Sequence, residues 1–598
     1  MSATLHHPHL NTPISATNQY WQFDKPNERD VLAVSQHYGL SDILARILVN
    51  RDIPFEAVPS YLNPTLREYL PNPLHLLHMK QAAQRLATAI MNKEKIAIFG
   101  DYDVDGATSS SLIKRFIQSV GHDAVIYIPD RIIEGYGPNT AALLKLREQG
   151  TSVCITVDCG TVAFDPLEAA HQAGLDIIVI DHHLGQEVLP AAVAVVNPNR
   201  IDETSPHRNL AAVGVSFLLA VAVNTIFKES GYYEGKTPPN LLELLDLVAL
   251  GTVCDVMTLT GLNRAYVSQG LKIMSQRKNM GLRTLCDVAG LDSEASVYHL
   301  GFVLGPRINA GGRVGEAGLG ARLLTTQDSF EAHDIAVKLN RYNEERKAIE
   351  DIVLTQAQEQ VIPYAKSKSM LFAYGTGWHP GVIGIVAGRI KEQHYRPIAV
   401  IAIDQDIGKA SVRSIPGVDI GKAITTAKQE GLLIAGGGHA MAAGFTVETQ
   451  KIPALWDYLC EAIREDVEIY GSKKIIHIDC SLTISSITPE FIRSLERLGP
   501  YGPGNPEPRV ALNNVTIVNM DLVGVDHIRC ILKDNKSLKS TSLKAMAFRC
   551  ANQPLGEFLL RSKGKAITVV GKPRINHWQG RESAEFTIED AADNIHIQ

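Results

Sequence analysis

Several features that would narrow the function at once are missing from this 598-residue sequence. There is no GxxxxGK[ST] motif, so nothing indicates the phosphate-binding loop of a P-loop nucleotide-triphosphate enzyme. The eight cysteines include no CxxC pair and several lie in apolar runs, which is typical of reduced thiols and not of a disulfide framework or a zinc site. We find no low-complexity tract, no secretory leader pattern and no run of about 18 apolar residues. We therefore expect a soluble, cytoplasmic protein.

The sequence also has no excess of positive charge. Its net charge of -6 gives no overall attraction to nucleic acids or anionic membranes, so a phosphate-rich partner would need local basic patches. With 45% hydrophobic and 20% charged residues, the composition is that of a globular protein. The chain is too long for one hydrophobic core, and we expect about three or four domains.

Five short apolar runs separated by helical segments follow one another between residues 95 and 197. They read KIAIF, DAVIYIP, SVCITV, LDIIVI and AVAVV. This alternation predicts a mostly parallel sheet covered by helices, an α/β fold. After the first run, apolar residues recur at helical spacing and predict a helix packed on the sheet; they are Leu112, Ile113, Phe116, Ile117 and Val120.

The rest of the chain divides by composition into further regions. We predict an N-terminal helical extension (1–65, with one amphipathic helix over 30–51), a large α/β domain (66–328), a connecting helix without proline or glycine (329–362), a smaller α/β domain (363–455) and a β-rich region (470–598). The last region is broken by turns into about five strands, which favours a small β-barrel such as an OB-fold.

Three aspartates, Asp101, Asp103 and Asp105, follow the first apolar run in KIAIFGDYDVDG. Because side chains alternate along an extended segment, we expect these three to point to one side. Convergent carboxylates repel and raise one another's pKa unless a divalent cation satisfies them. The alternative is a solvated loop that caps the following helix.

Other apolar runs end in the same way, which favours the cation. Asp158 ends SVCITVD; Asp181, His182 and His183 end LDIIVIDHH; and Asp255 ends the apolar segment LVALGTVCD. In an open parallel sheet the carboxyl ends of the strands share one crevice, so these groups are predicted to form a single two-metal site. Oxygen ligands with one imidazole suit Mn²⁺ or Mg²⁺ better than zinc.

Taken in order, DYDVDG, VDCG, DHH and GTVCDV resemble the four motifs of the DHH phosphoesterase superfamily. Chain length, the glycine-rich GGGHAMAAG segment and the β-rich tail further resemble the RecJ family of single-strand-specific DNA exonucleases, over essentially the whole chain. The resemblance implies a DHH domain with a parallel sheet, a smaller DHH-associated domain joined by a long helix, and an OB-fold domain. It also implies metal-dependent degradation of single-stranded DNA from its 5' end to nucleotide 5'-phosphates, in DNA recombination and repair.

The resemblance carries specific roles onto this sequence. It implies that two cations are held by Asp103, Asp105, Asp158, His182 and Asp255. Asp158 would bridge the two cations, and His183 would face the scissile phosphate. Some members of the superfamily have a histidine at the position of Phe99, and here Asp101 would supply the missing contact. We therefore expect the catalytic residues to be His183, Asp158 and Asp101. Asp181 is expected to orient a histidine.

Recognition of a DNA 5' end requires groups that bind its phosphate, for which guanidinium groups and backbone amides are suited. The candidates are Arg131, Arg307, Asn309, Arg313, Ser411, Arg413, Gly438 and His439. Any one of these arginines alone is more often an ordinary surface residue, but the glycines beside them let the backbone approach a ligand closely. Ser411 and Arg413, in SVRS, are the leading pair.

Further contacts with DNA are predicted at Tyr136 in GYG and, on the barrel, at Lys572, Arg574 and Trp578. The alternatives are that Tyr136 packs in a structural turn and that Trp578 fills the barrel core. The resemblance also implies single-strand-binding protein and a RecQ-type helicase as partners. We expect a monomer that binds no membrane.

Two other functions compete with a DNA exonuclease. A DHH phosphodiesterase for short RNA or cyclic dinucleotides would share the motifs, but it would not need a β-rich binding module of about 125 residues. A DNA-binding scaffold without catalysis would not be expected to keep every metal-ligand position except that of Phe99.

Overall fold

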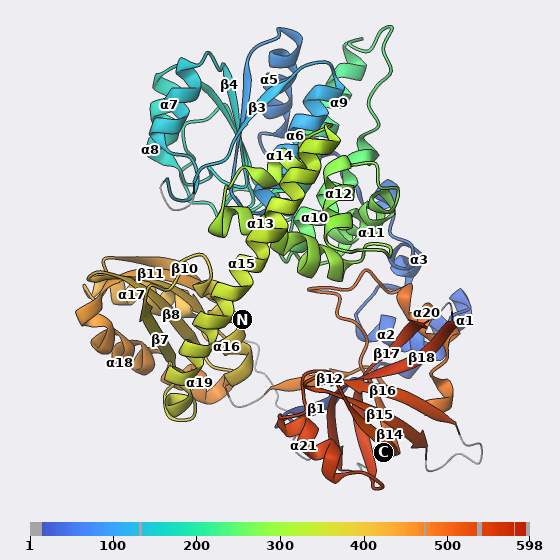
Figure 1. Ribbon diagram of the computed structural model, residues 1–598. Coiled ribbons are helices and arrows are strands. Elements are labelled where there is room, and N and C mark those ends of the chain that lie inside the picture. Colours follow the sequence, from blue (N-terminus) through green and yellow to red (C-terminus); the bar gives the residue numbers. More distant parts are fainter. Residues whose placement is uncertain (1–14, 131–133, 472–473, 535–540, 579–580, 594–598) are drawn as a thin grey trace. The chain divides into compact units, whose positions relative to one another are not determined.

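The computed structural model describes residues 15–130, 134–471, 474–534, 541–578 and 581–593 (Figure 1). The chain forms two compact units. The large α/β unit comprises residues 64–351 and 500–506. The discontinuous unit comprises residues 1–63, 352–499 and 507–598.

The centre of the large α/β unit is a five-stranded sheet that confirms all five predicted strands. These are β2 (Ile96–Gly100), β3 (Ala124–Tyr127), β4 (Val153–Val157), β5 (Asp176–Ile180) and β6 (Ala194–Val196). They pair in the order β3-β2-β4-β5-β6, and every pair is parallel. The carboxyl ends of all five strands therefore lie along one edge of the sheet.

Helices cover both faces of this sheet, as the near-continuous apolar strands predict (Figure 1). One face carries α5 (Met79–Met91), α6 (Val104–Ser119) and α9 (Ala212–Glu229), and the other carries α7 (Thr140–Glu148) and α8 (Phe164–Gln172). In β2, Ile96 and Ile98 pack toward the first face, whereas Ala97 and Phe99 pack toward the second. The predicted apolar face of α6 is buried against the sheet.

Helix α9 is strongly apolar, although polar residues such as Ser216 and Asn224 interrupt it. By length and composition it would suffice to cross a membrane, with a mean hydropathy of 1.5 over 18 residues. However, 72% of it is buried inside the protein, which is typical of the central helix of a globular core. It packs against α5 and α6.

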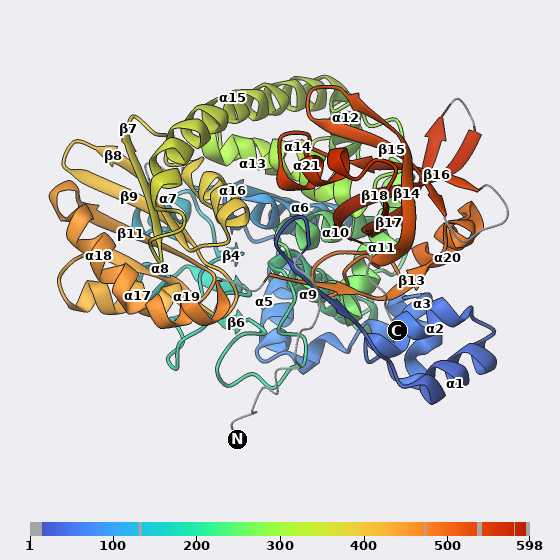
Figure 2. The same ribbon diagram turned by 90° about the horizontal axis from the view of Figure 1, so that it is seen from below.

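The remainder of the large unit is helical. It contains α10 (Leu245–Cys254), α11 (Gly261–Ser275), α12 (Met280–Val288), the π-helix η4 (His299–Leu304), α13 (Gly305–Val314) and α14 (Leu319–Thr325). The apolar segment before Asp255 is thus helix α10 and not a strand. The predicted connecting helix is confirmed as α15 (Ser329–Val361), whose full length is visible in Figure 2. At a rise of ~1.5 Å per residue, α15 is about 50 Å long.

A smaller sheet organises the middle of the discontinuous unit. Its strands are β7 (Leu371–Thr376), β8 (Ile398–Asp404), β9 (Ile407–Arg413), β10 (Ala435–His439) and β11 (Ala442–Glu448), in the order β10-β11-β9-β8-β7. Helices α16 (Ile383–His394), α17 (Ile420–Gln429) and α18 (Ile452–Ala462) pack with this sheet. The core beneath them continues to Val467, which lies beyond residue 455.

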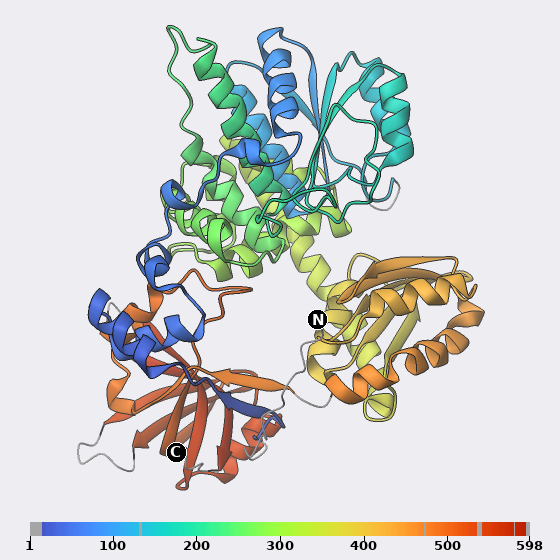
Figure 3. The same cartoon turned by 180° about the vertical axis from the view of Figure 1, so that it is seen from behind.

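The C-terminal part is a closed five-stranded barrel, as predicted (Figure 3). Its strands are β14 (Val510–Val523), β15 (His527–Asp534), β16 (Ser542–Ala547), β18 (Arg581–Asp593) and β17 (Ala566–Trp578), in this order. Pairing between β14 and β17 closes the cylinder, so neither strand is left as an open edge. Helix α21 (Pro554–Arg561) lies between β16 and β17 in the chain.

The N-terminal residues add a strand that the sequence did not predict. Strand β1 (Tyr20–Phe23) pairs in parallel with β12 (Ile475–Ile478). Trp21 in this strand is buried, and its indole Nε1 donates a hydrogen bond of 2.9 Å to Oδ2 of Asp590 in β18. The two ends of the chain therefore share one core.

The single amphipathic helix predicted over residues 30–51 is wrong. The segment forms two helices, α1 (Glu28–Tyr38) and α2 (Asp42–Asn50). Gly39 ends α1 in the left-handed conformation, with φ of 63°, and Ser41 caps α2 by accepting a hydrogen bond from the backbone N–H of Leu44. The glycine and the serine were the signals of the break.

Candidate metal centre

The predicted ligands meet at the carboxyl edge of the parallel sheet. Asp101, Asp158 and the Asp181–His183 triplet follow β2, β4 and β5, which are neighbours in the sheet. Three sets of side chains each offer ligand atoms within 4.8 Å of one another. They are Asp101, Asp103 and Asp158; Asp105, His182 and Asp255; and Asp158, His182 and His183.

The local structure of the first motif differs from the predicted extended segment. Asp103 is the N-cap of α6, where Oδ1 accepts a hydrogen bond of 3.1 Å from the backbone N–H of Gly106, and Asp105 lies in the first turn of this helix. Alternation along a strand therefore does not explain why the carboxylates converge. The helix start turns Asp103 and Asp105 toward the sheet edge. Asp103 therefore caps the helix, as the alternative predicted, and is also placed as a candidate ligand.

Asp105 is buried and fixed by a second helix. Its Oδ2 accepts a hydrogen bond of 2.7 Å from the backbone N–H of Ala212, and its Oδ1 accepts one of 2.9 Å from Val213, both at the start of α9. Burial and the nearby Asp103 raise the pKa of Asp105 to about 7, although these two hydrogen bonds oppose the shift. Sequence reasoning did not find this contact with α9.

Asp158 is held at the centre of the site by its backbone. It is buried, its φ of 61° is left-handed, and its N–H donates a hydrogen bond of 3.0 Å to the carbonyl of Ile180. Aspartate tolerates this conformation better than most residues because its short side chain can form local hydrogen bonds. Burial, Asp103 and Asp105 raise the pKa of its carboxyl group well above the usual range.

Asp255 and His182 complete the cluster from opposite sides. Asp255 follows the last residue of α10, and burial together with Asp105 raises its pKa to about 9. Nε2 of His182 lies 3.2 Å from Oδ1 of Asp158, 3.4 Å from Oδ2 of Asp255 and 3.8 Å from Oδ2 of Asp105. Burial and the neighbouring His183 lower the pKa of His182 to about 4, so this imidazole is neutral at pH 7 and can act as a nitrogen ligand.

Asp181 orients the second histidine. Its Oδ1 lies 2.8 Å from Nδ1 of His183 and also accepts hydrogen bonds from the backbone N–H groups of His182 and His183, while Oδ2 accepts one from Thr161. Burial opposes ionisation, but the hydrogen bonds from His183 and Thr161 hold the pKa of Asp181 below its usual range. In turn, the Asp181 contact overcomes burial and raises the pKa of His183 to about 9.

Two asparagines that sequence reasoning missed support the histidines from behind. Asn197 donates from Nδ2 to the carbonyl of His183 (2.7 Å) and to Oγ1 of Thr161 (2.8 Å). Nδ2 of Asn199 donates to the carbonyl of His182 (2.6 Å). Both residues follow β6, so the strand-end argument that found the carboxylates also applied to them.

The side chains present fit a pair of divalent cations. Oδ1 of Asp158 and Oδ2 of Asp255 are buried and accept no hydrogen bond from the described residues. Convergent carboxylates with raised pKa values are stabilised by a cation that neutralises their mutual repulsion. Carboxylate oxygens with one imidazole match the preferences of Mn²⁺ and Mg²⁺.

Comparisons with known proteins identify the domains and the family of this chain. Family models match in three places: the DHH family N-terminal domain at residues 95–252, the DHHA1 domain at 367–465 and the RecJ OB domain at 478–590. The chain is 33% identical over 583 residues to the single-stranded-DNA-specific exonuclease RecJ of Bacillus subtilis, covering 96% of this chain and 71% of that protein. This chain belongs to the RecJ family. The RecJ of Dickeya dadantii is also 33% identical, over 85% of this chain and 89% of that one.

Solved structures of the RecJ family share the whole architecture. The crystal structure of RecJ from Thermus thermophilus in complex with Mn²⁺ has a TM-score of 0.80 and 27% identity, covering 97% of this chain and 80% of that chain. The structure of the same protein in complex with Mg²⁺ has a TM-score of 0.75. These likenesses confirm the predicted DHH, DHH-associated and OB-fold domains.

The side chain of Phe99, where the resemblance implies a histidine in some superfamily members, points away from the candidate ligands. Its side chain is fully buried and stacks on Tyr127, with ring centroids 5.2 Å apart, on the face of the sheet that α7 and α8 cover. It therefore does not face the cluster. Asp101, two residues later, lies with Asp103 and Asp158.

The predicted 5'-end residues fall into two groups, one in each unit. Arg307, Asn309 and Arg313 lie on α13 of the large unit, where Arg307 donates from Nε to Oδ1 of Asn340 and from Nη1 to the carbonyl of Val303. Arg131 lies outside the described residues.

Ser411, Arg413, Gly438 and His439 lie together on the smaller sheet. Arg413 and His439 are both register partners of Ala442, so the three residues form one row across β9, β11 and β10. Nη1 of Arg413 donates a hydrogen bond of 3.1 Å to Oγ of Ser411, and burial lowers the pKa of Arg413.

The start of α16 approaches this arginine, a contact that the sequence did not predict. A Cβ atom at Gly384, the second residue of α16, would lie 3.0 Å from Oγ of Ser411 and 3.2 Å from Nη2 of Arg413. Glycine therefore keeps the first turn of α16 close to the Ser411–Arg413 pair. Backbone N–H groups at a helix N-terminus and a guanidinium group are together suited to an anion.

Tyr136 lies at the metal centre. Its hydroxyl donates a hydrogen bond of 3.1 Å to the carbonyl of Asp158 and lies 3.3 Å from either ring nitrogen of His183. Tyr136 is 52% exposed overall, but partial burial of its hydroxyl and the surrounding aspartates raise its pKa, so the hydroxyl stays protonated. These contacts fix the Tyr136 ring beside His183, and a contact of Tyr136 with DNA stays a prediction.

The predicted basic residues of the barrel are paired with acidic ones. Nζ of Lys572 lies 2.7 Å from Oε1 of Glu589, and Nη1 of Arg574 lies 2.6 Å from Oε1 of Glu507. Trp578 belongs to β17, but its side chain lies outside the described part of the structure. The contacts of Lys572, Arg574 and Trp578 with DNA stay predictions.

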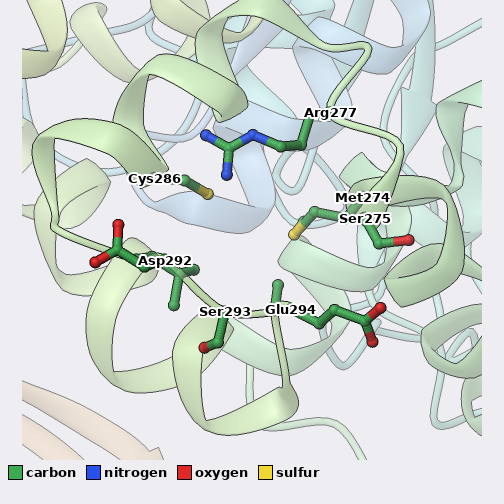
Figure 4. A pocket seen from close by; sticks show the side chains of 9 residues that line it. Met274, Ser275, Arg277, Cys286, Asp292, Ser293 and Glu294 are labelled. Atoms are coloured by element: carbon green, nitrogen blue, oxygen red, sulfur yellow. The ribbon is translucent and has the colours of Figure 1, made fainter. Parts of the chain in front are cut away.

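A pocket of about 250 Å³ lies elsewhere in the large unit (Figure 4). It is lined by the end of α11, by Cys286 of α12 and by residues 291–295. Arg277 points over it and is paired with Asp287. None of its lining residues belongs to the metal centre.

Proposed function

We propose that this chain is a metal-dependent exonuclease that degrades single-stranded DNA in the 5'-to-3' direction to nucleotide 5'-phosphates, in DNA recombination and repair. The observation that carries the proposal is the convergence of acidic and imidazole groups from four separate motifs at one edge of the sheet. Membership of the RecJ family supports the choice of substrate, because relatives at 33% identity are named single-stranded-DNA-specific exonucleases.

The five predicted ligands would hold two Mn²⁺ or Mg²⁺ ions: Asp103, Asp105, Asp158, His182 and Asp255. Asp158 is assigned to both ions because it belongs to two of the three ligand sets and its carboxylate has two oxygens, whereas His182, also in two sets, offers each set a ring nitrogen with one lone pair. When bound, such a pair supplies Lewis-acid chemistry that activates water near neutral pH and stabilises charge on phosphate oxygens. Asp101 lies close enough to Asp103 and Asp158 to supply the contact that Phe99 does not.

His183 is the proposed contact to the scissile phosphate. Asp181 fixes its ring through Nδ1, and this contact favours the protonated ring. A ring N–H held in this way can donate a hydrogen bond to a phosphate oxygen and stabilise the negative charge that grows there during hydrolysis.

Two sets of residues are proposed to bind the 5' end. On the smaller sheet these are Ser411, Arg413, Gly438 and His439, with the N-terminus of α16 behind the first two. On the large unit they are Arg131, Arg307, Asn309 and Arg313. The partly buried guanidinium of Arg413 supports the first set most strongly, because a charge withdrawn from water calls for an anionic partner.

We propose that the domains keep the limits predicted from the sequence and that each domain has its own role. Residues 66–328 would carry catalysis and 363–455 would bind the DNA end. Residues 470–598 would extend the contact with the single strand through Lys572, Arg574 and Trp578. Residues 1–65 and the connecting helix 329–362 would support these parts. The proposal includes action in the cytoplasm as a monomer, with single-strand-binding protein and a RecQ-type helicase as partners.

One experiment tests substrate, polarity and metal together. Oligonucleotides labelled at the 5' or the 3' end are incubated with Mn²⁺, Mg²⁺ or EDTA, and the products are resolved by size. We expect immediate release of labelled mononucleotide from the 5'-labelled strand, progressive shortening of the 3'-labelled strand and no reaction in EDTA. Hydrolysis confined to dinucleotides would instead support a phosphodiesterase for small substrates, and binding without hydrolysis would support a scaffold. Equal cleavage of blunt duplex DNA would contradict the single-strand specificity.

A further inference from the structure

Two exposed aromatic side chains of the large unit lie face to face at the π-helix η4. Tyr298 is 63% exposed and Phe302 is 72% exposed. Their ring centroids are 5.2 Å apart and the ring planes differ by 25°, a stacked pair. Leu300 and Leu304 of the same segment are buried, so the helix has a core face and an aromatic outer face.

The η4 segment is anchored to the end of α10 that carries Asp255. Sγ of Cys254 donates a hydrogen bond of 3.4 Å to the carbonyl of Leu300, and a Cβ atom at Gly301 would lie 3.5 Å from Cγ1 of Val253. The aromatic pair is therefore held on a fixed element next to a proposed metal ligand. Val256, directly after Asp255, is also exposed.

Helix α13 continues η4 without a break toward the first motif. At its far end, Gly312 packs so closely that a Cβ atom would lie 2.6 Å from the carbonyl oxygen of Tyr102, between Asp101 and Asp103. Asn309 and Arg313 follow Phe302 at helical spacing and are partly exposed. From Phe302 to Arg313 the helix rises by about 16 Å. The continuous helix formed by η4 and α13 thus runs from the aromatic pair to the loop that carries Asp101 and Asp103.

We infer that Tyr298 and Phe302 form a stacking platform for the bases of a single-stranded nucleic acid whose phosphates reach the metal centre. The inference rests on the proposed function, and it adds a binding site for bases at a distance from the bond that is cleaved. Aromatic faces stack on any base, which suits an enzyme that must accept every sequence. The position favours bases over a protein partner because the pair is anchored beside Asp255 and its helix continues to the loop that carries Asp101 and Asp103.

Because Tyr298 and Phe302 are exposed, their substitution should not disturb folding. The double variant Tyr298→Ala/Phe302→Ala removes both rings, and Tyr298→Phe/Phe302→Tyr keeps them. Phe330→Ala is the matched control, because Phe330 at the start of α15 is 83% exposed and lies outside the η4–α13 segment. Binding of a fluorescent oligothymidylate is measured by anisotropy in EDTA at several salt concentrations.

We expect the double alanine variant to raise the Kd by roughly 10- to 100-fold, the range for the loss of one or two stacked bases. The aromatic exchange and Phe330→Ala should change the Kd by less than about threefold. The salt dependence should be the same in all variants, because aromatic rings release no counterions. A Kd of the double variant within about twofold of the parent would overturn the inference.

A spectroscopic arm detects the stack directly. The added indole of Phe302→Trp should be quenched when oligothymidylate binds, and that of Phe330→Trp should not, after subtraction of the signal from the four native tryptophans. Equal quenching at both positions would contradict a local platform.

Hydrolysis of a 5'-phosphorylated dinucleotide separates this inference from the proposed function. A dinucleotide offers only one base beyond the bond that is cleaved, so the double variant should lose far less rate on it than affinity for long strands. If the parent neither binds nor cleaves single-stranded DNA, the proposed function fails. If the parent does both and the variants do not differ from it, only the platform fails.

Discussion

The metal centre and the basic cluster of the barrel are both dense in charge, but they differ in how the charges are matched. In the barrel, Lys572 and Arg574 pair with Glu589 and Glu507, and Arg509 also lies 2.5 Å from Glu589. Positive and negative charges alternate there, and the cluster is neutralised from within. Surface pairs of this kind contribute about 0–1 kcal/mol each to stability.

The metal centre has no such internal match. Within the described residues, the ion pairs of Asp105, Asp158 and Asp255 are made with histidines, and the closest of these, His182, is neutral at pH 7. The raised pKa values of these three carboxyl groups show that their ionised forms are unfavourable without a cation. A bound cation is therefore expected where the fold holds carboxylates together without a cationic partner, and not wherever charged residues are numerous.

The largest effect should follow removal of the most central carboxylate. We expect Asp158→Ala to lower hydrolysis on the order of 10³-fold or more, because a shared ligand of both cations is lost, while binding of single-stranded DNA in EDTA persists. Asp158→Asn is the matched variant, since asparagine tolerates the left-handed backbone that alanine strains. An alanine variant that keeps most of the parent rate would refute the bridging role.

Removal of the group behind the metal centre should have a smaller effect. Asp181→Asn keeps the size of the side chain but weakens the contact that orients His183, and we expect a loss of roughly 10- to 100-fold in kcat. The KM for single-stranded DNA should stay near the parent value. Unchanged kcat in Asp181→Asn would show that His183 needs no orientation by Asp181.

The next prediction compares two arginines of the discontinuous unit. Arg413→Ala should lower the preference for 5'-phosphate over 5'-hydroxyl ends by roughly tenfold, the effect of about 1.5 kcal/mol that one charged hydrogen bond contributes. Arg574→Ala is the control, because Arg574 lies on the barrel and has no proposed contact with the 5' end. Competition between the two kinds of end for hydrolysis measures the preference. The same preference in the Arg413 variant and the parent would remove Arg413 from the pocket.

The last prediction uses a buried carboxylate outside both clusters. Burial raises the pKa of Asp246, in α10, to about 6 from its usual 3.8. The folded state therefore binds the proton more tightly than the unfolded state, and this contribution to stability is lost as the pH rises through the folded pKa. Asp246→Asn should thus stabilise the protein by about 1–2 kcal/mol at pH 8 and by less at pH 5, without an effect on hydrolysis.

Calorimetric unfolding of the Asp246→Asn variant and its parent at both pH values measures this difference. An equal difference in stability at the two pH values would show that Asp246 does not titrate in this range. Lost hydrolysis would show that a raised pKa marks a functional group even at Asp246.

Much of the centre was predictable because its signals are local. Three of the five strands of this sheet, β2, β4 and β5, end in candidate ligands, and the topology of parallel strands brings those ends together, so the approach of Asp101, Asp158 and His182 was predicted from residue order. Asp105 and Asp255 were also found, although helices and not strands position them.

What could not be predicted depends on contacts between distant residues. No pattern near Asp105 indicates that the start of α9, more than a hundred residues later, binds its carboxylate. The approach of Gly384 to Arg413 likewise requires the packed sheet and helix. By contrast, the break between α1 and α2 was missed although its signals were local, because the apolar period continues through Gly39 and Ser41.

The hydrogen bond between Trp21 and Asp590 has a consequence for biosynthesis. The partners are separated by 569 residues, so the indole emerges from the ribosome long before the strand that covers it exists. The uninterrupted stretch 64–351 of the large unit can assemble meanwhile, since nearly all of that unit lies within it. We expect the discontinuous unit to close only when translation ends, and premature termination would release a chain whose N-terminal tryptophan has no core to enter.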